Sequence, residues 1–376
     1  MRPFSFCKPA WLLAATLALT PILASASGNS FIGPLTVTPG PSTVPANGDV
    51  NPYGVAVVPR STGKLIKGHV LVSNFNAVSN LQGTGTTIVD VAPSGTVTVF
   101  ATISAAGLPG ACPGGIGLTT ALSVLRSGWV IVGSLATADG TSTTAQAGCL
   151  LVLNQWGKVV ETFSGWRSGV QINGPWDMTA LDLGSVVELF VTNVLNGTVI
   201  PGADPSVPGK VVNKGTVVRI LLFIPAYGNP REVLRTVVGS GFPERTDPNA
   251  LVIGPTGVAL DDDGSLYVAD TQNNRIAKIP QAVTRFNSAG IGKTISVGGA
   301  LNQPLGIVVA PNGNVLEVNA GDGNIVEIAP WGAQVAVKDI DTSGAGGGTL
   351  FGLTLTPNKK GVYYVDDGDN TLDLLH

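Results

Sequence analysis

The sequence predicts an all-β protein, a six-bladed β-propeller with four-stranded antiparallel blades, and three observations support this fold class. Residues 254–279 recur in modified form at 303–328 and again at 351–375, and a repeat of this length is typical of stacked or radial folds. The chain has 50 glycines and 26 prolines but only 12% charged residues, a composition that suits short strands joined by tight turns. No segment of ten or more residues keeps a helical period.

Six repeat units can be aligned along the chain. Each unit opens with a glycine or its substitute, and a first strand, a tight turn and a second strand ending in a small polar residue follow. The units open at Gly54, Gly115, Asp177, Gly257, Gly306 and Gly352. The second strands are predicted at 69–74, 129–134, 189–193, 266–270, 315–319 and 362–366, and the third at 87–91, 149–153, 217–221, 275–279, 325–328 and 372–375.

The last unit lacks one strand. A fourth strand is predicted in the other five units, at 96–102, 159–163, 232–238, 293–297 and 334–338, whereas the sixth unit ends with the chain at His376. The segment 31–38 precedes the first unit and has no partner there. We therefore expect this N-terminal segment to supply the outer strand of the last blade, because such closure protects strand edges that would otherwise be open.

The first 26 residues resemble an export signal. Arg2 and Lys8 give a positive start, residues 10–23 are apolar, and Ala24-Ser25-Ala26 suits a signal peptidase. We expect cleavage after residue 26, leaving residues 27–376 as one propeller domain that is secreted or periplasmic. No later stretch approaches the roughly 18 apolar residues that a membrane-spanning helix needs, so no stable membrane insertion is expected after cleavage.

Charge and cysteine content narrow the function classes. Without Arg2 and Lys8 the chain has 19 basic and 24 acidic residues, a net charge of −5, and no run of Lys and Arg. The sequence therefore lacks the basic patch that is typical of nucleic-acid-binding proteins, and no nucleic-acid partner is expected. We also expect a monomer. Cys112 and Cys149 remain after cleavage. In an oxidising compartment they can form a disulfide, and two separate buried thiols are the alternative.

The predicted loops differ between the two faces of the ring. Turns that join first to second strands and third to fourth strands are short, and we call their side the turn face. The opposite side, the long-loop face, carries the longer connections at 77–85, 104–113, 136–148, 200–214 and 240–253. Long loops in compact folds are more often functional than short ones. We therefore expect an unknown protein or small molecule to bind at the long-loop face over the first three blades.

Small polar side chains end the second strands and are candidate ligands. They are Asn74, Ser134, Asn193, Asp270, Asn319 and Asp366. If they converge on the channel, their oxygen atoms suit a hard cation such as calcium; the alternative is that they bind backbone groups in the turns that follow. Asp177, beside Trp176, is expected at the channel mouth, where it either contacts a ligand or caps its own loop. Asp270 and Arg275 are expected to form an ion pair.

Glu317 interrupts an apolar pattern. It occupies the strand position filled by Val268 and Tyr364 in the neighbouring units, which places its carboxyl group between two blades. There it must either be paired or have a raised pKa. Catalytic groups are otherwise scarce, because His69 and His376 are the only histidines and no Gly-x-Ser-x-Gly motif is present. A three-histidine metal centre therefore cannot be built.

The fourth unit resembles an NHL repeat. The resemblance rests on Pro255-Thr-Gly-Val-Ala-Leu-Asp, on Leu266-Tyr-Val-Ala-Asp270 and on Asn274-Arg-Ile276. In the fifth and sixth units Asn324 and Thr371 stand where the family usually has arginine, and the first three units keep only the opening and the strand pattern. The resemblance implies a six-bladed propeller but leaves the activity open, since related propellers include protein-binding modules, lyases and calcium-dependent lactonases.

Two functions follow from these expectations. The first is an exported, non-catalytic binding scaffold with its ligand at Asn74, Trp176, Asp177, Asn193, Asp270, Asn319 and Asp366. The second is a calcium-dependent lactonase-like hydrolase or a lyase at the channel mouth. Its metal ligands would come from Asp177, Asn193, Asp270, Glu317, Asn319 and Asp366.

Overall fold

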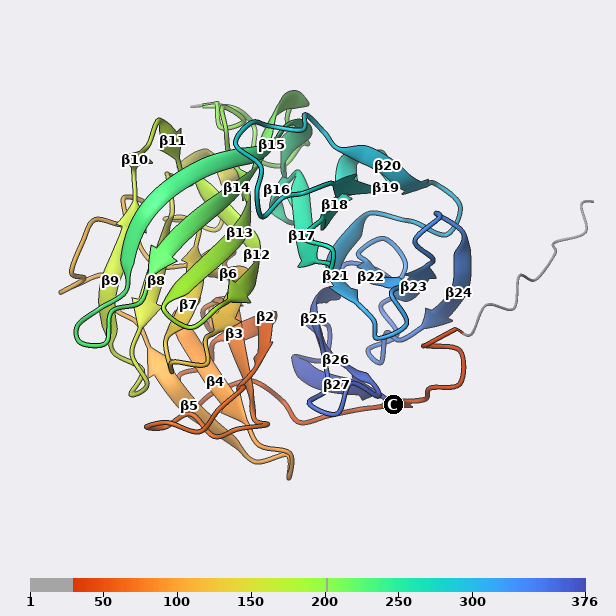
Figure 1. The fold of residues 1–376 in the computed structure, drawn as a ribbon, viewed down its shortest axis with the longest axis horizontal. Helices are drawn as coiled ribbons and strands as arrows, with labels where there is room; N and C mark the ends of the chain where they lie inside the picture. The colour runs from red at the N-terminus through yellow and green to blue at the C-terminus, as the bar shows by residue number, and fades with distance from the viewer. Residues whose placement is uncertain (1–29, 201) are drawn as a thin grey trace, which may run out of the picture.

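The chain folds into a ring of six antiparallel sheets around a central channel (Figure 1). The structure is a computed structural model that describes residues 30–376 except residue 201. The six innermost strands contact one another in a closed cycle, from the first blade to the sixth and back to the first. Apolar side chains pack between neighbouring blades, so each blade contributes both of its faces to the core. The predicted six-bladed propeller is confirmed.

The strands are ordered from the channel outward in every blade. The innermost strands are β2 (Val50–Val57), β6 (Leu118–Val124), β12 (Gly174–Asp182), β17 (Pro255–Leu260), β21 (Pro304–Val309) and β25 (Leu350–Leu355). The second strands are β3 (Val70–Asn76), β7 (Val130–Ser134), β13 (Val186–Val194), β18 (Leu266–Asp270), β22 (Val315–Asn319) and β26 (Val362–Asp366). The third strands are β4 (Thr87–Val91), β8 (Cys149–Leu153), β14 (Val212–Phe223), β19 (Arg275–Ile279), β23 (Asn324–Ile328) and β27 (Thr371–Leu375).

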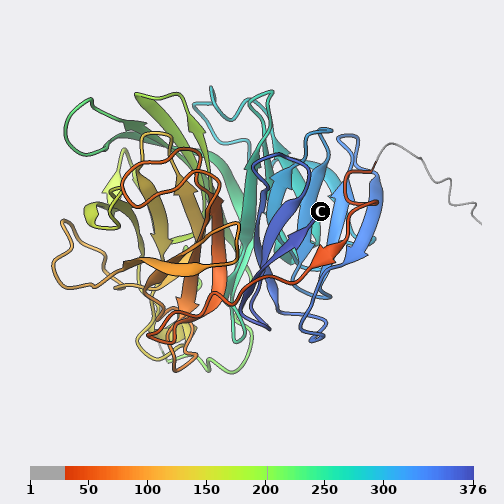
Figure 2. The same ribbon diagram turned by 90° about the horizontal axis from the view of Figure 1, so that it is seen from below.

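The outer strands close the ring as predicted. They are β5 (Val97–Thr102), β9 (Val159–Ser164), β15 (Arg231–Asp247), β20 (Lys293–Val297), β24 (Gln334–Asp339) and β1 (Val37–Thr38). The N-terminal strand β1 pairs antiparallel with β27, Val37 opposite Leu375 and Thr38 opposite Leu374. Figure 2 shows this strand beside the C-terminus. The paired segment is shorter than the predicted 31–38, because residues 30–32 bond to the Glu327 side chain instead of forming a ladder.

Two local predictions were wrong. The second unit was aligned on Gly115, but Leu122 pairs with Val132 as Val55 pairs with Val72 in the first blade, so Ala121 is the counterpart of Gly54. Gly115 lies in the loop before β6 instead. The third blade is also larger than predicted, because β15 continues past 238 and pairs with β16 (Leu251–Ile253).

Helix is nearly absent, as expected. The described residues contain two short 3-10 turns, Ser142–Thr144 and Thr271–Asn273, and a two-stranded hairpin, β10 (Trp166–Arg167) with β11 (Val170–Gln171). Within residues 30–200 and 202–376, no helix has the length and apolar character needed to cross a bilayer. The predicted signal segment 1–26 lies outside the described residues.

Candidate functional site

The channel is closed at the long-loop face by stacked aromatic rings. Three rings come from innermost strands, each from the residue just before the position that Gly54 occupies in blade 1; they are Tyr53, Trp176 and Phe351. The fourth ring is that of Phe75 on β3. The Tyr53 ring centre lies 3.8 Å from that of Phe351 and 4.5 Å from that of Phe75, with nearly parallel planes. The indole Nε1 of Trp176 donates a hydrogen bond to the Val252 carbonyl at 3.2 Å. These rings form a plug, so the Trp176 side chain is part of the core.

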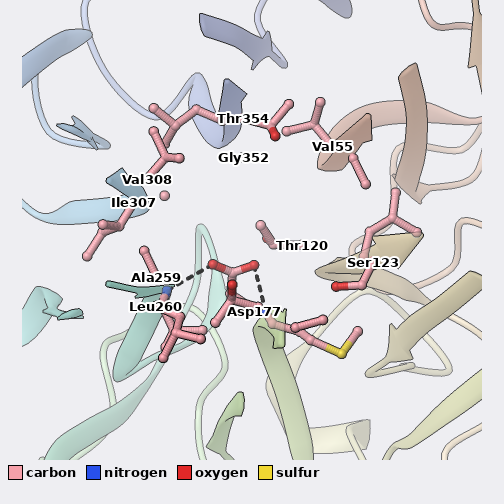
Figure 3. Close-up of a pocket in the computed structure, with 18 of the residues that line it drawn as sticks. Val55, Thr120, Ser123, Asp177, Ala259, Leu260, Ile307, Val308, Gly352 and Thr354 are labelled. Atoms are coloured by element: carbon pink, nitrogen blue, oxygen red, sulfur yellow. Dashed lines mark hydrogen bonds between the residues drawn. The ribbon is translucent and has the colours of Figure 1, made fainter. Parts of the chain in front are cut away.

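A cavity of about 310 Å³ lies in the channel beyond this plug (Figure 3). Its walls are the innermost strands, and the residues nearer the first-to-second strand turns, such as Val57, Thr179 and Thr354, are more exposed than the plug. The cavity therefore opens toward the turn face. Most of the lining is aliphatic, and its polar side chains are the hydroxyls of Thr120, Ser123, Thr179 and Thr354 and the carboxyl group of Asp177.

Asp177 is the one ionisable residue among the described residues that line the cavity. Its Oδ1 accepts a hydrogen bond from the Met178 N–H at 2.8 Å, and its Oδ2 accepts one from the Val258 N–H of the next blade at 3.0 Å. Burial raises the pKa of Asp177 to about 7, although the two N–H donors oppose this effect. The carboxyl group is thus held in place and changes charge near neutral pH.

The geometry of the ring explains why Asp177 stands alone at its level. The equivalent positions in the other blades are Gly54, Ala121, Gly257, Gly306 and Gly352. A Cβ on Gly257 would lie 2.0 Å from the Leu305 carbonyl oxygen, and one on Gly306 would lie 2.1 Å from that of Phe351. Glycine is therefore required where neighbouring innermost strands approach so closely. In blade 3 the Asp177 side chain instead accepts a hydrogen bond from Val258 on the neighbouring innermost strand.

A buried hydroxyl faces the same cavity. Thr120 is 4% exposed, lines the cavity, and its Oγ1 makes no hydrogen bond within the described part of the chain. A buried polar atom of this kind is uncommon and costs free energy unless something binds it. Sequence reasoning missed Thr120 because the second unit was aligned six residues too early. The correct strand register would have placed it at the level of the plug residues, in the blade between those of Tyr53 and Trp176.

The six polar residues that end the second strands do not line the cavity. All are at most 1% exposed. Most of them bond to the loop that enters their own blade. Four of them accept a hydrogen bond from a backbone N–H of that loop: Asn193 from Asn173 at 2.8 Å, Asn319 from Asn302 at 2.9 Å, Asp366 from Thr342 at 3.0 Å and Ser134 from Gly117 at 3.0 Å. Asn74 instead donates a hydrogen bond to the Thr43 carbonyl at 3.0 Å. Asp270 binds Arg275 at 2.7 Å, as expected. Their role toward a ligand stays a prediction.

Glu317 is buried without a partner. It lies on β22 between Ile307 and Val326, in the apolar layer between blades 4 and 5. The side chain is fully buried, and neither carboxyl oxygen has a hydrogen-bond partner within the described residues. Burial, with the nearby charge of Asp322 as a second cause, raises the pKa of Glu317 well above its ordinary value. Of the two expected alternatives, the raised pKa applies.

The predicted disulfide is confirmed. Cys112, in the loop that enters blade 2, is bonded to Cys149 at the start of β8, with a Cα–Cα distance of 5.3 Å. The bond fastens a long loop to the third strand of its blade.

The predicted calcium ligands do not form a coordination set. Calcium binds 6 to 8 oxygen atoms at 2.3–2.6 Å, but the described residues contain no group of three His, Cys, Asp or Glu side chains that could hold a metal ion. Asp177, Asp270, Glu317 and Asp366 come from four different blades. The residues thus do not fit calcium, and we derive no chemical step through it.

We expect that titration with calcium to 1 mM will release no heat beyond that of dilution, because the described residues contain no cluster of three acidic, His or Cys side chains to bind the ion. Isothermal titration calorimetry on chelator-treated protein checks this. A saturable signal that disappears in Asp366→Asn but persists in Asp262→Asn, an exposed turn residue, would revive the metal site.

Comparisons with known proteins agree with the fold. The NHL repeat family model matches residues 253–279, which form β17 to β19 of blade 4. A search of curated proteins found no match. Among solved structures, a gluconolactonase from Xanthomonas campestris has a TM-score of 0.54 at 14% identity, over 90% of this chain and 97% of that chain. The calcium-binding protein regucalcin from Agrobacterium tumefaciens has a TM-score of 0.52 at 12% identity, over 90% and 93%.

A third solved structure is similar. It is the PQQ-bound aldose sugar dehydrogenase from Streptomyces coelicolor, with a TM-score of 0.51 at 14% identity over 91% of this chain and 98% of that one. At such identities these similarities show a shared fold and nothing about activity. Together with the repeat match, they establish that this chain is a six-bladed β-propeller with an NHL repeat in its fourth blade.

Proposed function

We propose that this protein is an exported binding propeller that takes a small polar ligand into the channel cavity through the turn face. The single observation that carries this proposal is the cavity itself, in which the carboxyl group of Asp177 is held in place and Thr120, whose buried hydroxyl has no hydrogen-bond partner within the described residues, is part of the lining. Concave sites with a few fixed polar groups on mostly apolar walls are the usual form of small-molecule sites.

The chemistry of the walls narrows the ligand class. Each oxygen of Asp177 already accepts one backbone N–H but keeps a second lone pair for a donor. Four hydroxyl groups can donate or accept. A molecule with an ammonium group or several hydroxyl groups fits this set, whereas an anion would meet the carboxylate. Only the ionised form of Asp177 attracts a cation, so affinity for an amine should rise as the pH increases through about 7.

Asp177→Asn is expected to weaken the binding of such a ligand by about tenfold or more, because a hydrogen bond to a charged group contributes roughly 1.5–3 kcal/mol. The test is a thermal-shift screen with hexoses, sugar alcohols and small diamines, followed by calorimetry of the strongest ligand on both proteins at pH 6 and pH 8. Asp262→Asn is the matched control, since Asp262 lies in an exposed turn outside the cavity.

Three outcomes are informative. Loss of affinity in Asp177→Asn alone supports the channel site. Equal affinity in both variants would mean that the ligand binds elsewhere, and the long-loop face predicted from the sequence would then be the first alternative. If no member of the screen stabilises the protein, the cavity is not a site for these ligands.

A hydrolase is the second candidate, and one observation favours it. A carboxyl group with a pKa of about 7 is suited to act as a general base at neutral pH. Because the Xanthomonas campestris structure is a gluconolactonase, gluconolactone is the substrate to try. Hydrolysis that follows a single ionisation near pH 7 and is lost in Asp177→Asn would support an enzyme. A rate equal to the uncatalysed one would remove this candidate.

A further inference from the structure

The turn face of blades 6, 1 and 2 carries a concentration of basic side chains that is not evident along the sequence. Three lie in the loop between β2 and β3, one in the turn between β6 and β7, one next to the turn between β8 and β9, and two in the turn between β25 and β26. They are Arg60, Lys64, Lys67, Arg126, Lys158, Lys359 and Lys360, which we call the basic sector. All seven are exposed, and none forms a salt bridge within residues 30–376 as described.

Contacts between blades 1 and 2 make the centre of this sector one continuous surface. The Lys64 N–H donates to the Gln155 carbonyl at 2.9 Å, and the Thr62 hydroxyl donates to Gln155 Oε1 at 3.0 Å. Gly128 packs so tightly on Thr62 that a Cβ there would lie 2.4 Å from the threonine methyl group. The loop of blade 1 is therefore seated on two turns of blade 2, and its lysines are held beside Lys158.

Two large apolar side chains are exposed among these cations. Trp156, in the turn before Lys158, is 56% exposed, and Ile66, between Lys64 and Lys67, is 49% exposed. Two carboxylates touch the sector: Asp182 accepts a hydrogen bond from the Arg126 backbone N–H at 2.7 Å, and Asp90 binds the His69 ring at 2.8 Å. The sector thus combines unpaired positive charge with an indole and an aliphatic side chain.

We propose that the basic sector docks on the surface of a bilayer that contains anionic lipid. Lysine and arginine near such a surface are attracted by its negative potential, and indole rings prefer the interface between headgroups and acyl chains. The seven cations come from turns of three adjoining blades, and this spread of charge matches an extended anionic surface. Lys64 and Ile66 also line a hollow of about 340 Å³ together with His69 and Asp90. The basic side chains lie outside the cavity lining, but they share the turn face with the mouth of the channel, so docking would bring that mouth near the bilayer.

The test is co-sedimentation of the purified protein with vesicles of phosphatidylglycerol and phosphatidylcholine, compared with vesicles of phosphatidylcholine alone. Lys67→Gln/Lys158→Gln is expected to weaken binding about 25-fold, since each charge near an anionic surface contributes a factor of roughly five. The matched control is Arg167→Gln/Lys210→Gln, which removes two exposed charges from the long-loop face and should leave binding within about twofold. Raising the salt from 0.05 to 0.5 M should release the wild type, because screening shortens electrostatic attraction.

A second readout does not depend on charge. A blue shift of tryptophan fluorescence on adding anionic vesicles is expected for the wild type and is expected to be reduced in Trp156→Phe, whose thermal midpoint serves as the folding control. The assignment would be refuted if Lys67→Gln/Lys158→Gln and Arg167→Gln/Lys210→Gln lost vesicle binding equally. It would also be refuted if the wild type bound vesicles without phosphatidylglycerol. Tighter binding to a single-stranded oligonucleotide than to the anionic vesicles would refute it as well.

Discussion

Glu317→Gln should reduce the loss of stability that the wild-type protein undergoes as the pH rises to neutral. The remaining loss comes from Asp177, Glu244 and Asp367, whose pKa values are also raised by burial. The pKa of Glu317 is raised in the folded protein, so above the ordinary pKa of glutamate the folded state binds more of this proton than the unfolded state does. Stability then falls as the pH rises above the ordinary pKa of glutamate, by up to about 1.4 kcal/mol per pH unit. Between pH 5 and pH 7 the wild type should therefore lose stability relative to Glu317→Gln, by at most about 2.7 kcal/mol.

Glu317→Leu should additionally be more stable than the wild type at both pH values. It replaces two buried, unpartnered oxygens by carbon in an apolar layer, and each such unsatisfied group costs about 1–3 kcal/mol. Urea unfolding followed by tryptophan fluorescence at pH 5 and pH 7 measures both effects. A difference in midpoint between the wild type and Glu317→Gln that stays the same at both pH values would show that Glu317 is paired or hydrated in solution.

Glu327 provides the matched control, because it is also buried but has the opposite pKa shift. Burial alone would raise its pKa, but the N–H groups of Phe31 and Ile32 and the hydroxyl of Ser30 outweigh this effect and lower it. Stability from a lowered pKa is present above the ordinary pKa and is lost as the pH falls through the folded value. Glu327→Gln should therefore destabilise the protein at pH 7 and less so in acid.

Reduction of the Cys112–Cys149 disulfide should lower the free energy of unfolding by about 4 kcal/mol, because the bond closes a chain segment of 37 residues in the unfolded state. Urea unfolding with and without dithiothreitol measures this loss. Cys112→Ala/Cys149→Ala should behave like the reduced wild type and should not respond to the reductant. If reduction leaves the unfolding midpoint unchanged, the blade is held by its β-ladders alone.

The loop that carries Cys112 should loosen first. It enters blade 2 beside the turn at Gly115, and Cys149 begins β8, whose residues are fully buried. Amide exchange should therefore rise in residues 104–117 on reduction, while β8 stays protected by its pairing with β7 and β9. Equal deprotection of both segments would indicate that the whole blade depends on the disulfide.

Much of this fold follows from the sequence because its signals are local and repeated. Alternating strands between Gly-containing turns recur in six units, so strand order and the closing N-terminal strand could be predicted from the count alone. The pairing of Cys112 with Cys149 follows because both lie in the second unit. The buried position of Glu317 could also be predicted, since its slot holds Val268 and Tyr364 in neighbouring blades.

The register of blade 2 and the place of the cavity were decided by tertiary contacts. Gly115 and Ala121 are both followed by apolar residues in the sequence, and only the pairing of β6 with β7 shows that Ala121 holds the equivalent position. The closure of the channel at the long-loop face depends on rings from β2, β3, β12 and β25, which are far apart in the chain. Likewise, the blades that carry the basic sector become neighbours only when the ring closes, since the first blade packs on both the second and the sixth. A sequence pattern specifies which side chains face inward in each blade, but distances between blades depend on how all six pack.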